Sequence, residues 1–134
     1  MGYRSQVVLA VDKALMGKFL ACVSQCESTK NLVFAEADEK IENYNGDGNF
    51  LFRWDSVKWY DGYKEVDCIN DFMEEVDRME LDAITVSSPA GGPDHERKVM
   101  GEECYRFIRV GEENGDIEER GEGFQIYPQT TIHY

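Results

Sequence analysis

Apolar and polar residues alternate from Tyr3 to Val11, as they do in a strand whose two faces have different surroundings. Asp12 follows, with a side chain suited to cap a helix. From Lys13 to Cys26 the apolar positions recur at helical spacing, which predicts an amphipathic helix. The chain therefore opens with a strand and a helix whose apolar stripe is broad enough to cover a sheet.

Two further strands are predicted on either side of a tight turn. The first, Leu32–Glu42, starts apolar and becomes polar. The second, Phe50–Tyr60, has Phe50, Phe52 and Trp54 on the same face. The residues Asn45-Gly46-Asp47-Gly48 between them tolerate positive φ and favour a hairpin. The run after Trp54 is long for a flat strand and indicates a bulge.

The second half of the chain opens with a helix of clean period, predicted over Tyr63–Met79. Five segments are predicted after it: a strand at Leu81–Val86, a loop at Ser87–Pro93, a strand at Cys104–Val110, an acidic turn at Gly111–Gly121 and a tail at Phe124–Tyr134. The tail is aromatic and β-branched, and Pro128 interrupts it, which is typical of an edge strand.

The order of elements is β-α-β-β-α-β with additional C-terminal strands. This order predicts an α+β fold of the ferredoxin-like, split βαβ type, in which two helices cover one face of a single sheet. A length of 134 residues suits one domain, so we expect a single α+β domain over residues 1–134.

Composition supports a folded but strongly acidic protein. The hydrophobic fraction is 42% and the formal net charge is −13. The first value is sufficient for a core, and the second disfavours contact with phosphate backbones and anionic membranes. We therefore expect no direct nucleic-acid binding and no membrane association. A protein with a basic surface is the expected partner, and the alternative is that the acidity serves solubility alone.

Four cysteines, Cys22, Cys26, Cys68 and Cys104, form no C-x-x-C pair. The N-terminal residues read directly into a strand, without the pattern of a secretory leader. We therefore expect free thiols and a cytoplasmic protein.

The search for a catalytic or metal site finds none. Neither His95, in a charged loop, nor His133, near the end of the chain, has a Cys or His neighbour at ligand spacing. A calcium loop beginning at Asn43 would need a glutamate where Trp54 stands. The serines at 87 and 88 lack a nucleophile motif. We expect no enzyme, no cofactor and no metal.

The acidity is concentrated in two places. Residues 61–82 carry nine acidic and two basic side chains, residues 112–134 carry six and one, and residues 1–35 carry two and four. Close like charges on one helix are destabilising, so their retention indicates either a use in binding a basic partner or simply a solvated helix face. The candidate partner-binding residues are Asp67, Asp71, Glu74, Glu75, Asp77, Glu112, Glu113, Asp116, Glu118 and Glu119.

Three stretches resemble small acidic proteins of uncharacterised function that bacteriophages and prophages encode. They are Met1–Ser5, Trp54–Tyr60 and Phe107–Glu113 with its continuation Asp116–Glu119, about a fifth of the 134 residues. No catalytic motif comes with the resemblance. It implies an inhibitor of a host defence system, such as CRISPR or restriction, that imitates nucleic-acid charge on one side only.

Three functions follow as hypotheses. The first is a non-enzymatic protein that binds a basic surface of a host or phage protein. The second is a small-ligand-binding or enzymatic domain with a pocket on the open sheet face or beneath the 87–93 loop, using Trp54, Trp59 and Tyr105. The third is a phage accessory protein whose C-terminal edge strand pairs in a homo-oligomer.

Overall fold

A computed structural model describes residues 2–86, 95–128 and 132–133. Its centre is a five-stranded antiparallel sheet of order β2-β3-β1-β6-β7. The strands of this sheet are β1 (Ser5–Val11), β2 (Glu39–Tyr44), β3 (Asn49–Val57), β6 (Tyr105–Gly111) and β7 (Ile117–Arg120). The fold is thus mixed α+β, as predicted.

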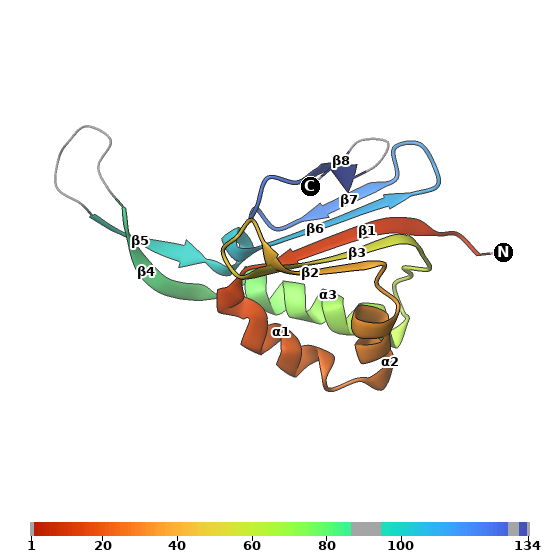
Figure 1. The fold of residues 1–134 in the computed structure, drawn as a ribbon, viewed down its shortest axis with the longest axis horizontal. Coiled ribbons are helices and arrows are strands. Elements are labelled where there is room, and N and C mark those ends of the chain that lie inside the picture. The colour runs from red at the N-terminus through yellow and green to blue at the C-terminus, as the bar shows by residue number, and fades with distance from the viewer. Residues whose placement is uncertain (1, 87–94, 129–131, 134) are drawn as a thin grey trace.

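Helices cover one face of this sheet (Figure 1). They are the 3-10 turn η1 (Lys13–Leu15), α1 (Met16–Val23), α2 (Glu27–Lys30), the π-helical segment η2 (Asn31–Ala35) and α3 (Lys64–Asp77). Asp12 caps η1 through its side chain, which accepts a hydrogen bond from the Ala14 amide. The predicted long helices are confirmed at α1 and α3, although α1 ends three residues earlier than expected.

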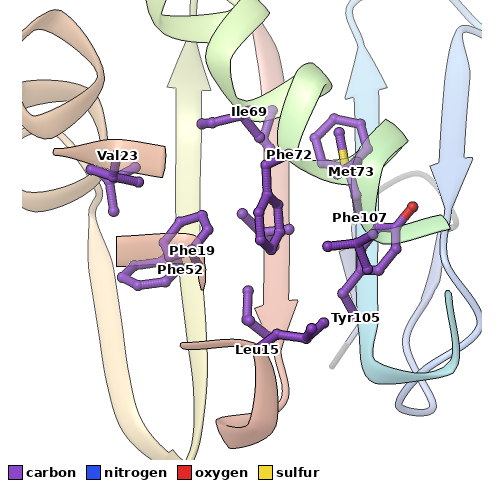
Figure 2. Packing of buried hydrophobic residues seen from close by; sticks show 14 of the residues in the cluster. Leu15, Phe19, Val23, Phe52, Ile69, Phe72, Met73, Tyr105 and Phe107 are labelled. Atoms are coloured by element: carbon purple, nitrogen blue, oxygen red, sulfur yellow. The ribbon is translucent and has the colours of Figure 1, made fainter. Parts of the chain in front are cut away.

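The main core lies between the sheet and these helices. Phe72 of α3 packs edge-on against Phe19 of α1, and Phe19 lies against Phe52 of β3 (Figure 2). Tyr105 and Phe107 of β6 close the layer on the other side. The period of α3 is the predicted one, since all five of its apolar positions from Val66 to Val76 are buried. Each such side chain contributes about 1.5–3 kcal/mol by leaving water.

The strand pairing confirms the predicted bulge and hairpin. Ser5 pairs with Val57, but Val7 pairs with Trp54, so β3 holds one extra residue in this interval. The turn between β2 and β3 contains Asn45 and Gly46 at positive φ, as the sequence predicts.

The strand predicted over Leu32–Glu42 is wrong in its first seven residues. The chain is helical through Ala35, and β2 begins only at Glu39. Leu32 and Val33 are buried there on a helix. A short apolar run fits either a buried strand or a buried helix, so the period alone could not decide.

Two strands were not predicted. The first is β7 (Ile117–Arg120), which pairs with β6 inside the segment that was predicted to be an acidic turn. The segment around His95, expected to be a loop, is strand β5 (His95–Met100), followed by the 3-10 turn η3 (Gly101–Cys104). Strand β5 pairs with β4 (Glu80–Val86) in a separate hairpin that extends from the body (Figure 1). The 87–93 loop lies outside the described residues.

The C-terminal tail is not an edge strand of the main sheet. Its described residues form a small hairpin of β8 (Tyr127–Pro128) and β9 (Ile132–His133). Ile126, just before it, is 1% exposed and packs on the sheet face opposite the helices, with Val8, Ala10, Leu51 and Ile108. A second, smaller core therefore covers this face, and the described edge strands of the sheet are β2 and β7.

Candidate functional site

The outer face of α3 carries the exposed part of the predicted acidic surface. Asp71, Glu74 and Glu75 are exposed on the side of the helix opposite its buried stripe. Glu75 forms a salt bridge with Lys18 of α1 at 2.7 Å. Glu74 forms one with Arg78, four residues later in the chain, at 3.0 Å. Asp71 has no cationic partner among the described residues. This face therefore keeps excess negative charge after its own pairs are counted.

A groove of about 270 Å³ separates α1 from α3 beside this face. Ala21, Cys22 and Phe72 are its apolar lining residues. The charged residues that line it are Lys18, Asp71 and Glu75. The Cys22 thiol donates to the Cys68 carbonyl at 3.2 Å, which joins the two helices across the groove. Burial raises the pKa of Cys22, and the neighbouring Cys68 and Asp71 raise it further. The groove thus combines apolar side chains with two carboxylates and one ammonium group, so its net charge is negative.

The carboxylates of the 112–119 region are used differently, because most of them bind groups of this chain. Asp116 accepts two hydrogen bonds from the Arg109 guanidinium, at 2.8 and 3.2 Å, and one from the Tyr3 hydroxyl at 2.6 Å. Bonding to Arg109, and then to Tyr3, lowers the pKa of Asp116 to about 2. Gly111 permits this arrangement, since a Cβ there would overlap both Asp116 and Tyr3. Asp116 is therefore a structural carboxylate.

Three neighbouring carboxylates also accept hydrogen bonds from groups of this chain. Glu118 accepts from Arg109 at 3.1 Å, Glu119 accepts from Arg106, and Glu112 accepts from the Arg4 backbone amide at 3.0 Å. Glu113 is exposed, and its side chain has no cationic partner among the residues described here. The arginines of β6 thus neutralise most of the acidic surface at β7.

The remaining two candidates hold the ends of α3. Asp67 accepts from the Gly62 amide at 2.9 Å, in the first turn of the helix. Asp77, in the last turn, accepts from the Tyr105 hydroxyl at 2.7 Å and from Arg120 at 3.2 Å. Burial and the Asp77 carboxylate raise the pKa of Tyr105. Asp67 and Asp77 therefore belong to the scaffold.

Two of the predicted carboxylates, Asp77 and Asp116, lie at opposite ends of β6. Asp116 lies beyond the end of β6, at Gly111, whereas Asp77 lies beside Tyr105 at the start of the same strand. A strand of seven residues separates these ends by about 20 Å. These two carboxylates therefore do not belong to one surface.

The cysteines are free, as predicted, but their thiols differ. Burial raises the pKa of Cys104 to about 11. Hydrogen bonds from Ser28 and Thr29 lower the pKa of Cys26 to about 6, with the Ser28 hydroxyl 3.0 Å from the sulfur. Cys26 directly precedes α2, and no spacing rule for cysteines would have revealed this environment.

The aromatic residues expected in a pocket on the open sheet face lie elsewhere. Trp59 and Tyr105 are 6% and 0% exposed, and both belong to the core beneath the helices. Trp54 is also buried, but it borders a cavity of about 400 Å³ at the end of the sheet where β3 terminates. The tail covers part of the opposite face through Ile126. These three residues therefore form no pocket on the open sheet face, although Trp54 borders a cavity. The alternative position, beneath the 87–93 loop, lies outside the described residues.

Comparison with known proteins gives no relative: no family model, no curated protein and no solved structure matches the chain. Within the described part of the chain, no helix has the length and apolarity needed to cross a membrane. The described residues also contain no group of three or more His, Cys, Asp or Glu side chains placed to hold a metal ion.

Proposed function

We propose that this protein is a non-enzymatic interaction protein that binds a basic surface of another protein through the groove between α1 and α3. The observation that carries the proposal is Asp71, an exposed carboxylate without a cationic partner in the described chain, which lines a groove together with apolar side chains. Glu75 lines the same groove, where Lys18 neutralises only part of the charge.

The groove suits the side chain of a lysine or arginine. The methylene stem of such a residue would pack on Ala21 and Cys22, while its charged end would reach Asp71 and Glu75. Charge-assisted hydrogen bonds of this kind are stronger than neutral ones. Glu74, exposed one turn along α3, would add long-range attraction that speeds association and weakens with salt.

The second acidic segment has a lesser part in this proposal. Arg109 and Arg106 already bind the carboxylates of Asp116, Glu118 and Glu119. Exchanging these internal partners for external ones would cost the fold its own contacts. We therefore assign binding to α3 and the groove, and assign the β6–β7 pairs to stability.

The resemblance to phage-encoded proteins is the basis for proposing a partner. Under this proposal the chain acts in the cytoplasm of a bacterial host and occupies a basic surface of a defence protein, such as a CRISPR effector or a restriction enzyme. A basic surface that normally holds nucleic acid would fit, and the mimicry would be limited to the α3 side of the molecule. The chain itself would bind no nucleic acid.

We further propose that the framework is ferredoxin-like. The supporting observation is the order β2-β3-β1-β6 with α1 and α3 on one face, which is the order expected of a split βαβ sandwich. The hairpin β4–β5 and the strand β7 would then be additions to it.

Affinity capture from a bacterial lysate at low salt, followed by direct binding to the partner identified, tests the proposed function. We expect the partner to bind the wild type, to be lost at high salt and to be lost with the Asp71→Lys/Glu75→Lys variant. The matched control, Asp47→Lys/Glu113→Lys, changes the net charge equally at two exposed positions away from the groove. Equal binding by both double variants would refute the proposed surface.

A further inference from the structure

The cavity of about 400 Å³ at the end of β3 lies where four parts of the chain converge. They are the residue before β1, the end of β3, the segment between η2 and β2, and the start of α3. Its volume falls in the range of small-molecule pockets, about 300–1,000 Å³.

The π-helical segment η2 fixes the apolar part of this cavity. The Glu36 amide donates to the Asn31 carbonyl, five residues back, at 2.9 Å. In an α-helix this amide would donate to the Leu32 carbonyl instead. The Leu32 carbonyl accepts a hydrogen bond from the indole Nε1 of Trp54 at 2.9 Å. Segments of π-helix are rare and are often found at functional sites, and here one positions a buried tryptophan beside the cavity.

Charges of both signs surround this apolar part, and they come from different elements. Arg4 directly precedes β1 and Lys58 directly follows β3. Because β1 and β3 are neighbouring antiparallel strands, the two cations lie at the same end of the sheet. The Arg4 guanidinium donates to the Ser56 carbonyl at 3.2 Å, which holds it beside the cavity.

The carboxylates come from the helical side and from the approach to β2. Asp38 is held by the Asp55 amide at 2.7 Å. The side chains of Glu36 and Glu65 have no cationic partner among the described residues, although both line the cavity. An exposed tyrosine, Tyr63, also lines it. The site thus offers cations next to the sheet, carboxylates from the helical layer and the approach to β2, and the exposed ring of Tyr63.

We propose that this cavity binds a free amino acid with an apolar side chain. The carboxylate of the ligand would pair with Arg4 and Lys58, and its ammonium group with Glu65 and Glu36. Its side chain would lie against Trp54 and Tyr63. A ligand of only one charge would leave either the cations or the carboxylates without a partner, whereas a zwitterion satisfies both. This site is separate from the α1–α3 groove and does not depend on the proposed function.

Titration of the full chain with the free apolar and aromatic amino acids tests this proposal, with tryptophan fluorescence and amide NMR shifts as readouts. Phenylalanine, leucine and methionine are the first probes, since they add no fluorescence of their own under tryptophan excitation. We expect saturable binding with shifts confined to residues around Trp54, Lys58 and Glu65. N-acetylated and amidated forms of the same amino acid, each lacking one charge, should bind about tenfold more weakly or worse.

Two variants and a control complete the experiment. Lys58→Gln should weaken the amino acid but leave the amidated form unchanged, and Glu65→Gln should weaken the amino acid but leave the N-acetylated form unchanged. The control Glu42→Gln alters an exposed carboxylate of β2 that does not line the cavity. The proposal is overturned if no amino acid gives saturable binding, or if the variants and the charge-deleted ligands bind as tightly as the parent pair.

Discussion

Asp116 illustrates how a residue in an acidic segment can serve the fold. Its carboxylate binds Arg109 and Tyr3 and thereby attaches the start of the chain to the turn between β6 and β7. Its pKa in the folded protein is about 2, below the ordinary value of 3.8. A lowered pKa means that the folded state favours the ionised form.

This shift predicts a pH dependence of stability. The contribution of Asp116 is fully present above pH 4 and is lost as the pH falls from about 4 to about 2, because protonation then removes the charge that Arg109 binds. Asp116→Asn should be less stable than the wild type by about 1 kcal/mol at neutral pH, allowing for the 33% exposure of the side chain. Chemical denaturation from pH 2 to 7 measures this difference, which should disappear near pH 2. Glu113→Gln is the control, and a constant difference for Asp116→Asn would contradict the assignment.

Cys26 gives a second prediction at this scale. Because its pKa is lowered to about 6, most of it is thiolate at pH 7, whereas Cys104, with a pKa of about 11, stays protonated. Iodoacetamide should therefore modify Cys26 first, with a rate that rises through about pH 6. Mass spectrometry of digested protein follows each site.

Ser28→Ala provides the test of the cause. It removes the first of the hydrogen bonds that lower the pKa of Cys26, so the pH midpoint of modification should move upward. Identical pH profiles for the wild type and Ser28→Ala would show that the serine does not stabilise the thiolate.

Among the elements, η2 is the one that most changes the interpretation of the sequence. Its π-type hydrogen bond leaves the Leu32 carbonyl to accept from Trp54. Trp54→Phe would keep an aromatic ring but leave this buried carbonyl without its partner, at a cost of about 1–3 kcal/mol. Thermal and chemical denaturation measure the change.

Trp59→Phe is the matched control, because Trp59 is also buried and packs against Trp54 in a tilted arrangement, with a centroid distance of 5.3 Å. No hydrogen bond from its indole is found among the described residues. Equal destabilisation by the two substitutions would mean that ring size, rather than the bond to Leu32, determines the effect.

Elements with a clear period could be predicted from the sequence, and those without one could not. The alternation in β1 and the spacing of apolar residues in α3 identified both correctly. The Leu32–Phe34 run is too short to separate strand from helix. Strand β7, Ile117–Arg120, contains three charged residues whose pairing with β6 no local pattern reveals.

The candidate site was predicted in part. The exposed carboxylates of α3 follow from its period, but the arginines that neutralise Glu118 and Glu119 lie on a different strand and become visible only in the sheet register. The cavity beside Trp54 was missed for a similar reason. It depends on η2 and the start of α3, whereas the incorrect assignment made Leu32–Asp38 part of a strand paired with β3 and left no helix there to border a cavity.

For the whole molecule, the C-terminal tail decides whether the second face of the sheet is open. Ile126 is buried on that face against Val8 and Ile108. Ile126→Ala should lower the free energy of unfolding by about 2–4 kcal/mol, since it creates a cavity in a small core. Tyr127→Ala is the control, because Tyr127 is 60% exposed and should change stability little. Similar losses for both variants would contradict the packing described.

The net charge of −13 is distributed unevenly over this body. Pairs with arginine neutralise much of β7, while the α3 face keeps Asp71 without a partner in the described residues. The α1–α3 groove, rather than overall acidity, is therefore the proposed basis of binding.

Amide NMR mapping with a short arginine-rich peptide tests this central claim most directly, because it locates the contact even while the natural partner is unidentified. We expect salt-sensitive shifts concentrated on Lys18, Cys68, Asp71 and Glu75, which Asp71→Lys/Glu75→Lys removes and Asp47→Lys/Glu113→Lys retains. Shifts that are absent from the groove, or that are equally strong along β7 and the 112–116 turn, would contradict the claim.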